Sequence, residues 1–392
     1  MTSPGTPAGQ QTVRRHNLSL ITTALATAAS SRAELAQRTG LTKATVSSLV
    51  DALLSQGILI EGVAPSARVG RPARPVGLNP DGPLALGIEI NVDYLAAGLL
   101  DLTGQLRAHR QVMVDNRERI AEATVRHAGT LARQLLAGTG APLLGAALAV
   151  PGVVSASGQL LRAPNLLKLA GARLGDELAP RLNLTRLPVD NEANFGALAW
   201  LRSSAEPDFV YVSGEIGVGA GVVVAGRLFR GVAGFAGELG HVVVDRNGPT
   251  CGCGGSGCLE QYAGQDVLLR NAAQPGPAAL EAAVAAGEPG ALAAVAEAGA
   301  ALGVGLASLL NVLDLPTVVL GGLYARLFDA LTPTLRAELD RRVLAGTGTR
   351  LRRSTLGADA TVRGAAGAVL DQALRDPGAL AGPGWPDGLR RT

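Results

Sequence analysis

The stretch DFVYVSGEIGVGAGVVVAGRLFRG at residues 208–231 contains two apolar runs on either side of a glycine-rich turn. Valine-rich runs joined by glycines are typical of two neighbouring strands of a sheet. Just before them, LPVDNEANFGALAWL (187–201) predicts a short strand, a few polar residues and then a helix. Later in the chain, LPTVVLGGL (315–323) predicts a strand that follows a long Ala/Leu helix and ends at two glycines.

Earlier segments extend this pattern. In LALGIEINVDYLAAGLLDLTGQLRAHRQV (84–112), NVD and DLTGQ separate the apolar runs, which predicts hairpins and an antiparallel start to a sheet. LLGAALAVPGVV (143–154) predicts another buried strand that ends at a Pro-Gly turn. Strands that alternate with helices and glycine hairpins indicate an α/β body in two lobes. We expect this body to occupy residues 81–392.

Composition narrows the class of protein. With 392 residues, 47% of them hydrophobic and 17% charged, the chain has the composition of a globular protein with two or three domains. Three cysteines favour the reducing cytoplasm over a disulfide framework. Residues 1–11 lack an apolar core and are expected to form a disordered leader, not a signal peptide. The most apolar stretch, 299–313, is too short for a membrane span and predicts a buried helix.

A helix-rich segment precedes the body. Residues 12–28 predict a first helix, because apolar side chains recur there at helical spacing: Val13, Leu20, Ile21, Leu25 and Ala28. In SSRAELAQRTG (30–40), Ser31 and Glu34 form a capping-box pattern and Gly40 ends a second helix, in which Leu35 and Ala36 face inwards.

The third helix of this segment lies in LTKATVSSLVDALLSQG (41–57), where Thr42 is the expected cap and Gly57 the end. Its buried stripe is expected to be Val46, Leu49, Val50, Leu53 and Leu54. ILIEG (58–62) and PVGLN (75–79) then predict two strands of a wing. Residues 12–80 therefore predict a winged helix-turn-helix.

Polar side chains at the start of the third helix suit base edges and phosphates in a major groove; they are Thr42, Lys43, Thr45, Ser47 and Ser48. Three arginines of the wing, Arg68, Arg71 and Arg74, lie among Gly and Pro residues and suit a minor groove. Residues 1–80 carry eight Lys/Arg against three Asp/Glu, whereas the whole chain has a net charge of only +3. This asymmetry favours double-stranded DNA as a partner over the alternative of a helical interaction domain without DNA.

All three cysteines lie in CGCGGSGCLE at residues 251–260. A zinc site requires four ligands in a tetrahedron, and we expect His241 to join Cys251, Cys253 and Cys258 in a structural Zn²⁺ site. Inert buried thiols do not explain the confinement to one short window. A redox pair more often has the spacing Cys-x-x-Cys.

Several motifs resemble the ROK family (repressors, open reading frames, kinases) across about 84–375: VDNEANFGALAW, GEIGVGAGVVVAGRLFRGVAGFAGELGH, CGCGGSGCLE and VVLGG. The resemblance implies an actin/hexokinase-like fold behind the helix-turn-helix. Lobe 1 is then expected at about 81–190 plus the C-terminal helix, and lobe 2 at about 191–365. GIEINVDYL and VDNEAN resemble the xylose-repressor branch of the family.

The resemblance also implies a sugar pocket and supports the zinc ligands. The matching sugar-binding positions are Asn191, Glu192, Glu238, His241 and Glu260. Carboxylates, an amide and an imidazole bind vicinal hydroxyls with paired hydrogen bonds. His241 is expected to ligate zinc through one ring nitrogen and donate to the sugar through the other.

Enzymatic activity is not expected. The family's kinases carry Asp-Ile-Gly-Gly-Thr where this chain has Glu89-Ile90-Asn91-Val92-Asp93, and we expect Val92 and Asp93 to obstruct phosphate binding. Glu192 replaces the aspartate that serves these kinases as general base. We therefore expect a cytoplasmic, sugar-responsive repressor that binds a palindromic operator as a homodimer or tetramer, with xylose and glucose as candidate effectors. The alternatives are a sugar kinase with an accessory DNA-binding head, and a constitutive DNA-binding protein with a vestigial pocket.

Overall fold

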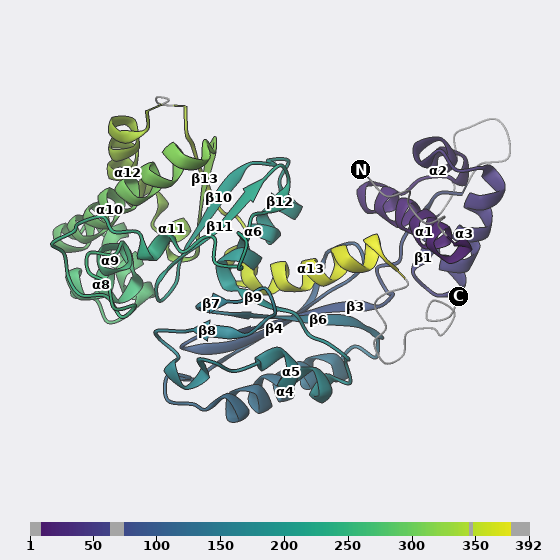
Figure 1. Ribbon diagram of the computed structural model, residues 1–392, viewed down its shortest axis with the longest axis horizontal. Coiled ribbons are helices and arrows are strands. Elements are labelled where there is room, and N and C mark those ends of the chain that lie inside the picture. The colour runs from purple at the N-terminus through teal and green to yellow at the C-terminus, as the bar shows by residue number, and fades with distance from the viewer. Residues whose placement is uncertain (1–8, 63–73, 345–347, 378–392) are drawn as a thin grey trace, which may run out of the picture.

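The computed structural model describes residues 9–62, 74–344 and 348–377, which form a small head and a larger body (Figure 1). The first sheet of the body has the strand order β5-β4-β3-β6-β9. Strands β3, β4 and β5 form an antiparallel meander, while β6 and β9 run parallel to β3. This confirms the predicted hairpins. The strands are β3 (Leu84–Ile90), β4 (Tyr94–Leu100), β5 (Leu106–Met113), β6 (Leu143–Val150) and β9 (Val189–Asn191), with a small β7 (Val153–Val154)–β8 (Leu160–Arg162) ribbon beside them.

The second sheet has the order β12-β11-β10-β13-β14. The quoted stretch 208–231 forms its β10–β11 hairpin, as predicted, and β13 and β14 run parallel to β10. The strands are β10 (Phe209–Gly214), β11 (Val218–Val224), β12 (Arg227–Leu228), β13 (Thr317–Gly321) and β14 (Arg350–Arg353).

Helices cover both sheets. Helix α4 packs on the first sheet, and α10 packs along α12 beside the second (Figure 1). Two helices, α6 and α13, contact each other between the sheets. The helices of the body are α4 (Ala121–Ala137), α5 (Leu174–Leu178), α6 (Glu192–Ser203), α7 (Glu260–Ala263), α8 (Gln265–Asn271), α9 (Pro277–Ala285), α10 (Pro289–Leu313), α11 (Gly322–Arg326), α12 (Phe328–Arg342) and α13 (Ala360–Arg375), with short 3-10 turns η1 (Leu167–Leu169), η2 (Ala179–Leu182), η3 (Leu239–His241) and η4 (Gly357–Asp359).

Helix α10 is the one helix of the described ranges that is long and apolar enough to cross a membrane, judged by length and composition. Half of its most apolar window is buried inside the protein. A Cβ atom at Gly303 would overlap the Glu338 side chain of α12, which shows how closely the two helices pack. The predicted buried helix at 299–313 is therefore the second half of α10.

The head consists of α1 (Gln10–Thr27), α2 (Arg32–Thr39), α3 (Lys43–Ser55) and an antiparallel pair, β1 (Leu59–Glu61) and β2 (Val76–Leu78). The capping box of Ser31 and Glu34, the left-handed Gly40 and the Thr42 cap are all confirmed. The predicted helical spacing over 12–28 falls within α1, although Val13 is 46% exposed. Helix α1 begins at Gln10, two residues before the expected start of the head at residue 12.

The apolar core of the head continues into the body. Leu18, Ile21 and Leu25 of α1 belong to the same buried cluster as Leu370 and Leu374 of α13. Three further buried clusters lie within the body: one on the first sheet, one around α10, and a small one between α6 and the second sheet. The division at residues 80 and 190 remains a prediction, and the head is anchored on α13 by buried side chains.

Candidate metal and ligand site

A pocket with about 770 Å³ of space, open solvent included, lies at the carboxyl end of β9 and beside the β10–β11 turn. Its lining includes all five residues predicted to bind sugar: Asn191, Glu192, Glu238, His241 and Glu260. They come from separate segments, since β9 ends at Asn191, α6 begins at Glu192, η3 ends at His241 and α7 begins at Glu260. The fold thus brings together side chains up to 69 positions apart.

Asn191 is held rigidly at the N-terminus of α6. Its Oδ1 accepts a hydrogen bond from the Ala193 N–H at 2.8 Å, and its Nδ2 donates to the Gly152 carbonyl at 2.9 Å. The next residue, Glu192, has its Oε2 buried without a hydrogen-bond partner among the residues that the structure describes. Burial, followed by the charges of Glu89, Glu215 and Glu260, raises the pKa of Glu192 well above its ordinary value. An unpartnered buried acceptor of this kind is available to a ligand hydroxyl.

Glu238 and Glu260 face the pocket near His241. His241 Nε2 lies 4.0 Å from Glu238 Oε2. The pKa values of Glu238 and Glu260 are both raised, because the effect of burial exceeds the opposing effect of the neighbouring His241. A Cβ atom at Gly217 would overlap Glu260 Oε2, so the glycine turn after β10 leaves the space that this carboxylate occupies.

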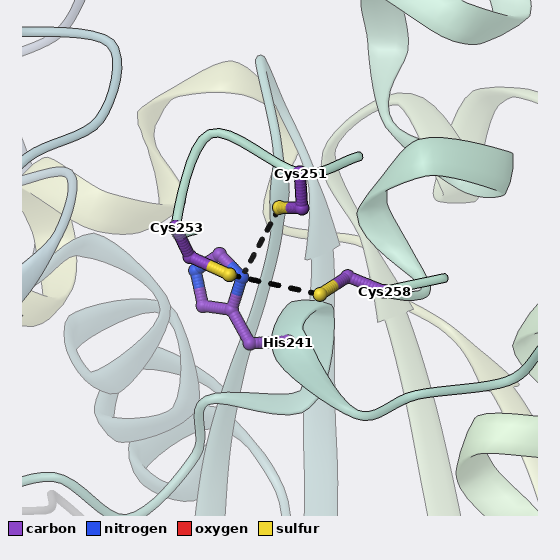
Figure 2. Close-up of side chains that lie close together, drawn as sticks. All are labelled: His241, Cys251, Cys253 and Cys258. Atoms are coloured by element: carbon purple, nitrogen blue, oxygen red, sulfur yellow. Dashed lines mark hydrogen bonds between the residues drawn. The ribbon is translucent and has the colours of Figure 1, made fainter. Parts of the chain in front are cut away.

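A second group of side chains adjoins the pocket. The Nδ1 atom of His241 lies 3.7 Å from Cys251 Sγ, and Cys253 Sγ lies 3.7 Å from Cys258 Sγ (Figure 2). The four potential ligand atoms all lie within 4.8 Å of one another. Two thiolates bound to one tetrahedral zinc at about 2.3 Å are separated by roughly 3.8 Å. The group therefore has a donor set and spacing that fit a metal ion.

The loop that carries the cysteines is closed by its own backbone. Cys251 N–H donates to the Gly255 carbonyl at 2.8 Å, and Gly254 N–H donates to the Cys251 carbonyl at 2.9 Å. Gly257 has φ +71°, and a Cβ there would overlap the Asp245 carbonyl, so this position requires glycine. Because Glu260 follows Cys258 by two residues, the geometry of this loop also sets the position of Glu260.

The sequence of this chain was compared with protein families and with individual known proteins. The ROK family profile matches residues 85–372. This chain belongs to the ROK family. The xylose repressor of Bacillus subtilis (strain 168) is 31% identical over 360 residues, which cover 88% of this chain and 92% of that one. A glucokinase of Thermotoga maritima is 31% identical over 191 residues, which cover 47% of this chain and 58% of that one.

Solved structures of ROK proteins have the same fold. The crystal structure of a ROK family transcriptional regulator, a homolog of the E. coli MLC protein, has a TM-score of 0.76 at 22% identity and covers 93% of this chain and 97% of that one. The ROK family glucokinase of Streptomyces griseus, solved with glucose and AMPPNP, has a TM-score of 0.63 at 27% identity and covers 72% of this chain and 98% of that one. The expected actin/hexokinase-like α/β fold is confirmed.

The turn after β3 differs from expectation in this ROK chain. Val92 is fully buried in the core of the first sheet, and Asp93 forms an ion pair with Arg117 at 2.5 Å. The Val92 side chain therefore does not obstruct the turn, and the charge of Asp93 is countered. A different group fills the turn, because Asn91 Oδ1 accepts the Val92 N–H at 2.6 Å.

Three carboxylates beside the pocket, Glu89, Glu215 and Asp190, were not assigned from the sequence; Glu89 and Glu215 act on Glu192 by their charge, and Asp190 precedes Asn191. Glu89 is 1% exposed, and burial together with the charge of Glu215 raises its pKa to about 7. Asp190 Oδ1 accepts from Asn194 Nδ2 at 2.8 Å, while its Oδ2 accepts from Arg230 Nε at 2.9 Å. The only signal for Asp190 was its place in VDNEAN, beside Asn191.

The described residues that were predicted to contact DNA lie on α3, at its cap or just before β2, and these elements belong to the head (Figure 1). Lys43 and Ser48 are exposed on α3, and Ser47 is half-buried. Thr42 Oγ1 caps the helix and also lies 2.9 Å from Thr45 Oγ1, so these two hydroxyls already have partners. Arg74 is exposed, with Nη1 3.6 Å from Glu61 Oε2, whereas Arg68 and Arg71 lie outside the described residues.

Proposed function

We propose that the protein is a sugar-responsive, DNA-binding repressor. The observation that carries this proposal is the combination of one pocket lined by five sugar-compatible side chains with a basic helical head anchored on the same body. The similarity to a xylose repressor supports it, because the match spans 88% of the chain, whereas the glucokinase match spans 47%.

The head is proposed to bind double-stranded DNA as a winged helix-turn-helix. Its α2 and α3 would form the helix-turn-helix, with Lys43 and Ser48 of α3 exposed to a major groove. The β1–β2 pair would be the base of the wing. A homodimer would place two such helices about 34 Å apart and favour a palindromic operator. A regulator of this kind acts where the DNA is, in the cytoplasm.

The pocket is proposed to bind an aldose, with xylose and glucose as the candidates. Glu192, Glu238 and Glu260 supply acceptors for sugar hydroxyls, and Asn191 is fixed by its hydrogen bond to Gly152. Carboxylates that are partly shielded from water make strong hydrogen bonds to hydroxyl donors.

A structural Zn²⁺ ion is proposed for His241, Cys251, Cys253 and Cys258. Four such ligands complete a tetrahedron and leave no open position for catalysis. The metal would hold the loop before Glu260, and its role would be to shape the pocket.

Kinase activity is the weaker alternative. The turn that would cradle phosphates has its Val92 N–H bound to the Asn91 side chain, and buried Glu89 precedes it. Sugar-dependent ATP hydrolysis above that of a Glu192→Ala variant would reverse this assignment.

Thermal unfolding with added sugar tests the pocket. A ligand at 100 times its Kd stabilises the native state by about 2.7 kcal/mol, which raises Tm by several degrees. We expect D-xylose or D-glucose to do so for the wild type but not for Glu238→Gln. Exposed Glu122, on α4, provides the matched control Glu122→Gln. A Tm that neither sugar raises contradicts the proposal.

A further inference from the structure

Helix α6 is in contact with both sheets and with the pocket. Its first residue, Glu192, lines the pocket. On one face, a Cβ at Gly221 of β11 would lie 2.6 Å from the Ala193 carbonyl, so the helix backbone rests directly on the second sheet. A movement of that sheet around a bound ligand therefore moves α6.

The opposite side of α6 rests on α13. A Cβ at Gly364 would overlap the Phe195 carbonyl, which means that the two backbones touch without an intervening side chain. Further along, Arg202 forms an ion pair with Asp371. Close-packed interiors are only slightly compressible, so a displacement of α6 is passed to α13.

The far end of α13 contacts the head (Figure 1). The carbonyl of Leu374 is among the last four of the helix, which have no partner within a helix. The Oγ1 atom of Thr22, a fully buried residue of α1, forms a hydrogen bond with this carbonyl and also lies 3.0 Å from the Leu18 carbonyl of its own helix, so one hydroxyl bridges α1 and α13. Arg15 of α1 forms an ion pair with Asp376, just beyond the helix.

A cavity beside α13 gives the helix room to shift. It is lined by Ala368, Val369 and Gln372 on α13 and by the Asp190–Arg230 pair across from them. Val154 and Gly234 line both this cavity and the ligand pocket. The cavity therefore lies between α13 and the ligand pocket, with Val154 and Gly234 as the shared wall.

We propose that α13 carries the occupancy of the pocket to the head, with Thr22 as the residue that couples them. This inference rests on the proposed sugar-binding function. It does not require that the head bind DNA, because the coupling is a property of the free chain. Loss of Thr22 Oγ1 leaves both sites intact but removes the hydrogen bond that links the moving helix to α1.

Hydrogen–deuterium exchange on the full-length, DNA-free chain tests this coupling with D-xylose and D-glucose. We expect saturating sugar to change exchange of the α1 amides about 5-fold or more in the wild type, within the usual range of allosteric coupling. In Thr22→Val the change should fall below about 2-fold, while the sugar Kd stays within about 3-fold. Thr23→Val is the matched control, because Thr23 is exposed on the same helix, and it should behave as wild type.

The outcomes separate this inference from the proposed function. Sugar binding that leaves α1 exchange unchanged in the wild type, or a full response in Thr22→Val, overturns the coupling and leaves the sugar site in place. A change in α1 that does not alter operator affinity supports the coupling and contradicts the repressor assignment. A chain that binds neither sugar contradicts both. If Thr22→Val does not fold, Arg15→Gln removes an exposed partner at the same junction and should weaken the response.

Discussion

The Sγ atoms of Cys253 and Cys258 lie 3.7 Å apart, close to the separation of two thiolates on one tetrahedral zinc. Glu260 follows two residues later and lines the ligand pocket. The cysteines and the pocket residue Glu260 therefore belong to one short loop, and His241 belongs to both groups, so loss of the metal group should also affect the pocket.

We expect purified protein to contain about one zinc per chain, and Cys253→Ser to bind zinc at least about 100-fold more weakly, because one of four ligands is lost. Its sugar affinity and Tm should fall as well, because Glu260 loses its support. Elemental analysis and calorimetry measure both effects. Ser256→Ala, an exposed position of the same loop, is the control. A metal-free wild type with a normal Tm would contradict the account.

Gly217→Ala should weaken sugar binding without unfolding the chain. The added methyl group overlaps Glu260 Oε2, and the flexible end of this side chain can move away. Because a hydrogen bond to a charged group contributes about 1.5–3 kcal/mol, we expect a loss of roughly 10–100-fold in sugar affinity. Titration calorimetry measures it, with Gly290→Ala as control, since nothing lies within 4 Å of a Cβ there. An unchanged sugar affinity would contradict the assignment of Glu260 as a sugar-binding residue.

Local signals made much of this structure predictable. The capping box of Ser31 and Glu34 spans three residues, and the cysteines of the metal group lie within one short window, so each pattern carries its own evidence. The α13 partner of Thr22 lies 352 positions away, and the arginine partner of Asp190 lies 40 positions away. Nothing near either residue in the sequence indicates such a contact, because it depends on how the sheets and α13 pack.

Lys43→Ala should lower operator affinity and reduce the dependence of that affinity on salt. The logarithm of the binding constant falls linearly with the logarithm of the salt concentration, and each phosphate contact adds about 0.9 to the steepness of that line. We therefore expect the slope to decrease by about one in fluorescence anisotropy titrations. The chain has two lysines, and the other, Lys168, lies in the body, so Lys168→Ala is the matched control. An equal effect of both substitutions would contradict a phosphate contact at Lys43.

Stability should depend on pH through Glu89. Burial raises the pKa of Glu89 from 4.5 to about 7, so the folded state favours the protonated carboxyl. The stability that this protonated form provides is fully present below pH 4.5 and is lost as the pH rises through about 7. Glu89→Gln keeps the acceptor for Tyr94 and removes the buried charge. We expect the substitution to raise the free energy of unfolding at pH 8 by up to about 3 kcal/mol, and by little at pH 4.5.

Urea unfolding at the two pH values measures this difference. Glu122→Gln, at an exposed position of α4, should have little effect at either pH. A gain for Glu89→Gln that is the same at both values would mean that the Glu89 carboxylate is not destabilised by its surroundings.

The turn after β3 shows where prediction from the sequence reaches its limit. The residues from Glu89 to Asp93 are read directly from the chain, but the direction of each side chain depends on tertiary packing. Val92 enters the core and Asn91 fills the turn with its own hydrogen bond. The sequence identifies the turn that differs, and the structure identifies Asn91 Oδ1 as the atom that occupies the Val92 N–H.

Sugar binding is expected to change the affinity of this protein for DNA, and fluorescence anisotropy measures that affinity directly. The probe is a labelled duplex selected by the full-length protein from random sequences, titrated with and without saturating D-xylose or D-glucose. We expect one sugar to weaken binding about 5- to 150-fold in the wild type and to have little effect in Glu238→Gln. Operator affinity that stays the same with a sugar shown by calorimetry to be bound would contradict the claim.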